Sequence, residues 1–91
     1  MSQRDPMPSR YSAIVRAVAA EHGVRLRDIF ASNGPRRVQD ARLAIYARIR
    51  ATPLLCGHLP SYPQIGRWMG RDNSTVWSGV RAHHAKEEAR P

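Results

Sequence analysis

Cysteine is almost absent from this sequence, and long apolar runs are missing. Cys56 is the single cysteine among 91 residues, which excludes an intrachain disulfide framework and a zinc site built on paired cysteines. We therefore expect a reducing, cytoplasmic environment. No apolar run approaches the roughly 18 residues that span a bilayer, and no apolar signal segment stands at the N-terminus. We expect no membrane association, no metal, no cofactor and no small-molecule substrate.

Acidic residues are also scarce, and so is lysine. Seven Asp and Glu stand against fifteen Lys and Arg, which gives a formal net charge of +8. Fourteen of the fifteen are arginine, and Lys86 is the only lysine. The planar guanidinium suits phosphate oxygens and guanine edges. The composition therefore predicts a polyanionic partner, with nucleic acid as the first choice.

The length and the hydrophobic pattern predict one small all-α domain. The chain is too short for an ATPase module or for a two-domain enzyme with a cleft, so we do not expect an enzyme. We expect a flexible arm over residues 1–8, a domain over residues 9–85 and a charged tail over residues 86–91. Apolar residues recur at helical spacing and strand-like alternation is absent. The expected helices cover residues 9–22, 25–31, 36–51, 61–69 and 72–85.

Several residues mark the ends of these helices. Ser9 is placed to cap the first helix, and Gly23 follows it as a left-handed stop. Ser61 and Gln64 form the pattern of a capping box at the start of the fourth helix. Gly70 ends that helix, and Asp72 is placed to cap the fifth.

The same spacing predicts which side chains face the core. In the second helix we expect Leu26, Ile29 and Phe30 to point inward. In the fifth helix we expect Trp77 on the apolar side with Val76 and Val80. Large aromatic residues at helical spacing usually pack in so small a core, and the same applies to Trp68.

The segment over residues 61–81 carries the clearest functional pattern. It is a short helix, a turn with one glycine and a second helix, which is the sequence form of a helix-turn-helix. The second helix begins with the short polar residues Asp72, Asn73, Ser74 and Thr75, which allow close approach to base edges in a major groove. The alternative is that these four residues only cap a surface helix, although capping requires one or two polar residues and not four.

The same segment resembles a known family. Residues 64–76 read Gln-Ile-Gly-Arg-Trp-Met-Gly-Arg-Asp-Asn-Ser-Thr-Val, which is similar to the C-terminal DNA-binding domain of the bacterial replication initiator DnaA. The family signature is an Ile-Gly pair, an aromatic and glycine, then Arg-Asp-His-Ser/Thr-Thr-Val. Upstream, residues 36–46 resemble the family's basic loop and the Ala-Arg-led helix after it, and Asp28-Ile29 resembles an Asp-Leu pair before that loop. The similarity covers about residues 12 to 84.

The resemblance implies a helix-turn-helix of the DnaA domain IV or Trp-repressor kind that binds double-stranded DNA. The major-groove contacts of the family fall on Asp72, Asn73, Ser74 and Thr75, and its minor-groove arginine falls on Arg36. Asn73 stands where the family usually has histidine, so the base preference is expected to differ. The loop before Ser61 is about five residues longer than usual. Because an ATPase domain is absent, we expect a stand-alone, nucleoid-associated domain acting in replication or transcription control.

The remaining basic residues are interpreted from charge alone. We expect phosphate contacts from arginines around the proposed DNA-binding helices, namely Arg37, Arg42, Arg48, Arg71 and Arg81. A second hypothesis is that the DNA-binding fold serves as a protein adaptor in replication, which binds a helicase or the initiator through the apolar loop of Leu54, Leu55 and Cys56.

Overall fold

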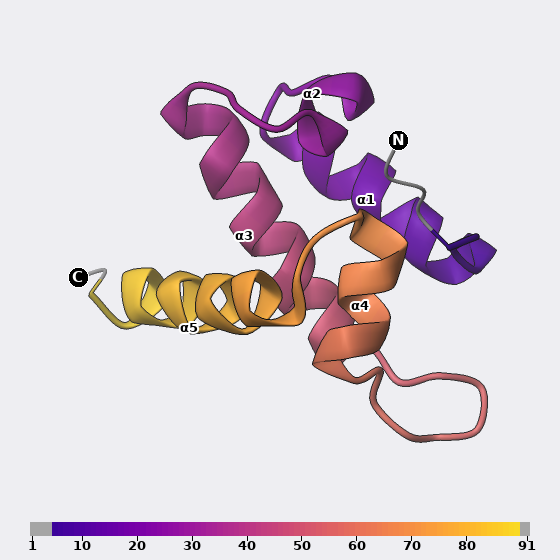
Figure 1. Ribbon diagram of the computed structural model, residues 1–91. Coiled ribbons are helices and arrows are strands. Elements are labelled where there is room, and N and C mark those ends of the chain that lie inside the picture. Colours follow the sequence, from indigo (N-terminus) through magenta and orange to yellow (C-terminus); the bar gives the residue numbers. More distant parts are fainter. Residues whose placement is uncertain (1–4, 90–91) are drawn as a thin grey trace.

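The computed structural model describes residues 5–89, and this part of the chain consists of α-helices without a strand (Figure 1). The all-α fold predicted from the sequence is confirmed. The helix bounds agree with the predicted ranges to within one residue everywhere except at the end of the last helix. The helices are α1 (Ser9–Glu21), α2 (Leu26–Phe30), α3 (Arg36–Ala51), α4 (Tyr62–Met69) and α5 (Asn73–Ala89).

The two ends differ from the expected arm and tail. Residues 1–4 of the expected arm, and residues 90–91 of the expected tail, lie outside the described residues. Asp5, a residue of the expected flexible arm, is bound to α4. Its N–H donates to the carbonyl of Arg67 at 3.0 Å, and its carboxylate pairs with the Arg67 guanidinium at 3.3 Å. α5 continues through the residues assigned to the tail as far as Ala89, and Lys86 Nζ donates to Asp40 Oδ1 at 2.6 Å. This bond ties the last turns of α5 to α3.

α3 is the central helix, since it contacts each of the other four. Its apolar stripe of Val38, Ala41, Ile45 and Ile49 is buried, as the spacing predicts. α5 crosses α3 closely at Gly79, where a Cβ atom would lie 2.7 Å from Tyr46 Cδ2. A side chain at this position would therefore push the two helices apart.

Glycine and serine set the helix ends as the sequence indicates. Gly23 has φ +65°, and its N–H and that of Val24 bond the carbonyls of Ala20 and Ala19, which is the hydrogen-bond pattern of a Schellman motif. Ser61 and Gln64 form the predicted capping box at the start of α4. Ser9 does not cap α1, because Pro8 occupies the N-cap position and no side-chain cap bond is present.

The two tryptophans have different environments. Trp68 is buried and stacks on Tyr11 with ring centroids 4.9 Å apart. Trp77 is 46% exposed on α5, so the expectation that it packs in the core is wrong. Leu26, also expected inward, is 40% exposed, because the single turn and a half of α2 buries only Ile29 fully.

The α3–α4 loop, residues 52–61, returns the chain to the core only at its ends. Pro60 is buried and Leu54 packs against the core, whereas Leu55 is 91% exposed. The loop closes on itself through the Leu54 N–H, which donates to the His58 carbonyl at 2.8 Å. Its apolar tip therefore faces solvent.

Candidate functional site

A tight turn between α4 and α5 fixes the start of α5. Gly70 ends α4 with φ +69°, and the Arg71 N–H donates to the Gly66 carbonyl at 2.8 Å. A Cβ atom on Gly66 would lie 2.5 Å from the Arg71 carbonyl oxygen. Only glycine therefore fits at this position, and the turn brings α5 directly against α4.

The first turn of α5 is polar and faces solvent. Asn73, Ser74 and Thr75 are all exposed, as is Asp72 before them. The Ser74 hydroxyl donates to Asp72 Oδ2 at 2.5 Å, so one of the two carboxylate oxygens has an intrachain partner. The amide of Asn73 has no hydrogen bond to any described residue and is available to a ligand.

Arg42 is a structural residue, which corrects its assignment to phosphate. The side chain is 3% exposed. Its Nε donates to the Ile29 carbonyl at 2.9 Å, and its Nη2 donates to the carbonyls of Asp28 and Ala31, each at 2.7 Å, and of Asn33 at 3.1 Å. Burial, and then the charge of Arg71, lower the pKa of Arg42. Arg42 thus holds the end of α2 and the α2–α3 loop in place.

Arg71 joins the two halves of the site. Its Nη2 donates to the Ala31 carbonyl at 2.5 Å and to the Ile29 carbonyl at 3.4 Å. These bonds hold the α2–α3 loop beside the α4–α5 turn, so Ser32 and the start of α3 are fixed near the start of α5. Only the Nη2 of Arg71 donates to these carbonyls, so its Nε and Nη1 are left to bind a ligand.

Three of the predicted arginines are exposed and take part in none of the ion pairs within residues 5–89, although the charge of Arg36 acts on Asp40 one turn further along α3. The four ion pairs within residues 5–89 use Arg48, Arg67, His83 and Lys86, and leave out Arg36, Arg37 and Arg81. Arg36 lies at the first position of α3, on the same helical face as Asp40 and Leu43. Arg81 lies over the exposed Trp77 ring, 4.8 Å from its centroid.

Arg48 is not part of this group. Its guanidinium pairs with Glu21 at 3.2 Å, and it lies with residues of α1 and the end of α5 on another part of the surface. Arg50 is also used internally, since its Nη1 donates to the Pro60 carbonyl at 2.6 Å and the group lies over Tyr62. Arg48 and Arg50 therefore contribute to the net charge of the chain but have partners within the molecule.

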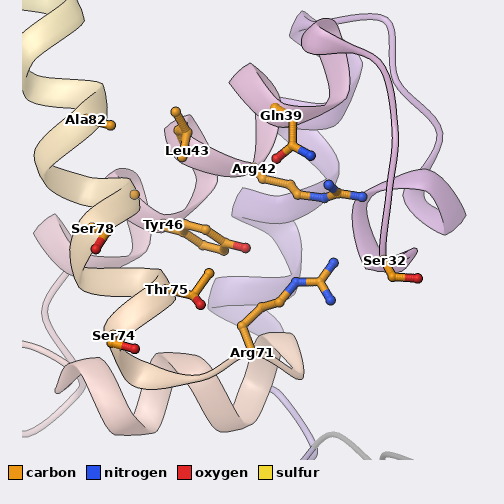
Figure 2. Close-up of a pocket in the computed structure, with 11 residues that line it drawn as sticks. Ser32, Gln39, Arg42, Leu43, Tyr46, Arg71, Ser74, Thr75, Ser78 and Ala82 are labelled. Atoms are coloured by element: carbon orange, nitrogen blue, oxygen red, sulfur yellow. The ribbon is translucent and has the colours of Figure 1, made fainter.

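A pocket of about 560 Å³ lies where α3, α5 and the α2–α3 loop meet (Figure 2). Sequence reasoning did not find it, because its residues come from four separate segments. A partial signal was present in α5, where small hydroxyl residues recur on one face at Ser74, Thr75 and Ser78. In Figure 2, the side chains of Tyr46 from α3 and of Arg71 from the α4–α5 turn extend toward the same space. The lining includes Ser32, Gln39, Arg42, Leu43, Tyr46, Arg71, Ser74, Thr75, Ser78, Gly79 and Ala82.

Other kinds of site find no support in the described part of the chain. Residues 5–89 contain no group of three or more His, Cys, Asp or Glu side chains arranged to hold a metal ion. None of the helices in this range combines the length and the hydropathy that crossing a bilayer requires.

Comparison with protein-family models, with curated proteins and with solved structures finds no match to this chain. The functional interpretation therefore rests on the residues and on their arrangement.

Proposed function

We propose that this protein binds double-stranded DNA through α4 and α5, which act as a helix-turn-helix. The observation that carries the proposal is the exposed polar first turn of α5, together with exposed arginines that form no ion pair within residues 5–89. Asn73, Ser74 and Thr75 are short enough to let a helix N-terminus approach base edges in the major groove. The sequence resemblance to the DnaA domain supports the same assignment, with a role in replication or transcription control.

Each residue group has a distinct role in the proposal. Asn73 reads a base edge, and Asp72, Ser74 and Thr75 contact neighbouring bases or phosphates. Arg36 enters the adjacent minor groove, where a narrow groove concentrates negative potential. Phosphates are bound by Arg37, Arg81 and the remaining donors of Arg71, whereas Arg42 and Arg48 have intrachain partners and are left out.

The first experiment measures affinity for a pool of random duplexes as a function of salt. With three or four phosphates neutralised, the log–log slope of affinity against salt should be about −3. Arg36→Gln should weaken binding by about 1–3 kcal/mol. The charge-matched control is Arg48→Gln, which removes the same charge from the Glu21 pair and should leave affinity nearly unchanged. Equal losses in both variants would show that net charge alone drives binding.

The second experiment selects preferred sites from the random pool. A bidentate bond from the Asn73 amide to adenine discriminates by about 1–3 kcal/mol. Asn73→Ala should therefore flatten the preference at one or two adjacent base pairs and leave the salt slope as it was, because a neutral side chain releases no counterions. If the wild type and Asn73→Ala select the same sequence, Asn73 does not contact a base.

A second candidate function is that of a protein adaptor in replication. The observation that favours it is the leucine tip of the α3–α4 loop, where Leu55 is 91% and Leu59 is 47% exposed. The absence of any duplex binding at about 50 mM salt, where electrostatic contacts are strong, would favour this function over DNA binding.

A further inference from the structure

The pocket between α3 and α5 is positively charged and has no acidic residue in its lining. Arg42 and Arg71 both face it, and none of the ion pairs within residues 5–89 involves either residue. Their intrachain partners are backbone carbonyls, which satisfy N–H groups but carry no net charge. Two guanidinium charges therefore lie at one recess whose lining contains no carboxylate, although Asp28 acts on Arg42 from outside the pocket.

The hydroxyl of a largely buried tyrosine, Tyr46, points into the same space. Tyr46 is 2% exposed, and its ring packs where α5 crosses α3 at Gly79. Its hydroxyl makes no hydrogen bond to any described residue. Figure 2 shows this hydroxyl directed into the gap between the Arg42 and Arg71 side chains. None of the buried side-chain oxygens and nitrogens in residues 5–89 lacks a partner, so the Tyr46 hydroxyl is the accessible tip of a buried ring and can donate to an acceptor in the pocket.

We propose that this pocket binds a phosphoryl group. The donors come from several directions: the Tyr46 hydroxyl from α3, the guanidinium of Arg71 from the α4–α5 turn, and the hydroxyls of Ser74, Thr75 and Ser78 from α5. A phosphoryl group presents three or more oxygens in a tetrahedral arrangement, so it can accept bonds from all of these sides, whereas the two oxygens of a carboxylate lie in one plane. The phosphoryl group is carried either by a DNA backbone or by a small phosphate ester.

The pocket also bears on the proposed function, although it does not depend on it. Ser74 and Thr75 line the pocket and belong to the first turn of α5. An occupant would therefore touch the helix that is proposed to read DNA. A backbone phosphate would fix the register of α5 on the duplex, and a small phosphate ester would occupy a site beside it.

The direct test is a titration of the intact protein with inorganic phosphate at constant ionic strength, without DNA. Amide NMR signals of Ser74, Thr75 and Ser78 report occupancy. We expect saturable shifts in the wild type and binding about tenfold weaker in Tyr46→Phe, the loss that follows from one hydrogen bond to a charged group. The matched control is Tyr62→Phe, which removes a phenolic hydroxyl outside the pocket. Arg71→Gln with its control Arg67→Gln gives the same comparison for the guanidinium.

Three results would overturn the proposal. These are the absence of saturable shifts at about 10 mM phosphate, well above a millimolar Kd, an equal response to acetate, and equal affinity in Tyr46→Phe and the wild type. Thermal melting checks that each variant is folded. Tyr46→Phe should melt as the wild type does, because the hydroxyl has no intrachain hydrogen bond to lose.

A second arm adds a short DNA duplex and distinguishes the two sources. If the pocket takes a backbone phosphate, inorganic phosphate competes with the duplex and Tyr46→Phe lowers duplex affinity. If it takes a small phosphate ester, the protein–duplex complex binds phosphate as the free protein does. Either result supports the pocket. If phosphate fails to bind but the duplex binds, this inference is wrong and the proposed function stands. If phosphate binds but the duplex does not, the pocket stands and the proposed function is wrong.

Discussion

The two longer connections of the molecule are both held by arginines, but they are held at different places. The α2–α3 loop is bound along its length, since Arg42 donates to the carbonyls of Ala31 and Asn33 and Arg71 donates to that of Ala31. The α3–α4 loop is bound at its ends, where Arg10 donates to the Pro53 carbonyl and Arg50 to that of Pro60. Between these points the backbone hydrogen bonds of the α3–α4 loop run within the loop, from the Leu54 N–H to His58 and from the Gly57 N–H to Leu54, and Leu54 alone packs partly against the core.

The difference explains what each loop can present. A loop fixed in its middle holds Ser32 and the start of α3 at a defined position beside α5, which a polar binding site requires. A loop fixed only at its ends leaves its tip with few packing contacts, and such segments open at low free-energy cost. The first loop therefore belongs to the candidate site, and the second displays apolar side chains such as Leu55 in solvent.

The largest expected effect comes from removing the buried guanidinium. Arg42→Met should lower the free energy of unfolding by about 3 kcal/mol or more, because it removes a buried donor from four backbone carbonyls, of which that of Asn33 accepts from no other donor within residues 5–89. Arg50→Met, its counterpart at the α3–α4 loop, removes one carbonyl bond and the contact with Tyr62 and should cost about 1 kcal/mol. Urea denaturation measures both. Equal losses would show that the two loops are held equally strongly.

Glycine substitutions should give the next largest contrast. Gly66→Ala should cost about 2 kcal/mol, since its Cβ would meet the Arg71 carbonyl oxygen at 2.5 Å. Gly57→Ala, in the α3–α4 loop, meets no atom within 4 Å and has only the strain of φ +93°, about 1 kcal/mol. Thermal melting compares the two. A smaller loss at Gly66 than at Gly57 would contradict the tight turn before α5.

Adjacent leucines sharpen the comparison within the α3–α4 loop. Leu54→Ala should cost about 1 kcal/mol, because this side chain packs partly against the core. Leu55→Ala should stay within about 0.5 kcal/mol of the wild type, since 91% of its surface is already in solvent. Urea denaturation again provides the measurement, and a loss at Leu55 similar to that at Leu54 would place the loop tip on the core.

The smallest effect concerns the bond between α5 and α3. The hydrogen bond from Lys86 holds the pKa of Asp40 below its usual value of 3.8. A carboxyl with a lowered folded-state pKa stabilises the fold above the unfolded pKa and loses this contribution as the pH falls through the folded value. Lys86→Met should therefore cost less than about 1 kcal/mol at pH 7, and the difference should shrink below about pH 4. Lys86→Arg, which keeps the charge, is the control.

The sequence predicts much of this fold because its signals are local. The capping box of Ser61 and Gln64, the left-handed glycines at 23 and 70, and the apolar stripe of α3 each depend on neighbouring residues. Helix propensity and capping depend on residues within one or two turns, so they can be predicted from neighbouring residues in the sequence. The burial of Gly79 against Tyr46 also agrees with the cost of a mid-helix glycine.

Contacts between segments far apart in the sequence are harder to predict, and the arginines show why. A charged side chain looks the same in the sequence whether it faces solvent or backbone carbonyls 13 residues away, as Arg42 does at Ile29. A usable signal was nevertheless present, since Arg42 occupies a position within the stripe of Val38, Ile45 and Ile49. For Trp77 no such signal exists, because α5 is exposed on more than half of its circumference and either side could hold the ring.

The contrast between Trp68 and Trp77 gives the protein two built-in fluorescent reporters. Trp68, stacked on Tyr11 in the core, should emit in an apolar environment and be shielded from a dissolved quencher such as iodide. Trp77, on the exposed side of α5 under Arg81, should be quenched readily. Replacing Trp68 by phenylalanine leaves a chain whose emission comes from α5 alone. The emission wavelength and the iodide quenching of Trp77 then report binding at the surface of α5 without an added label.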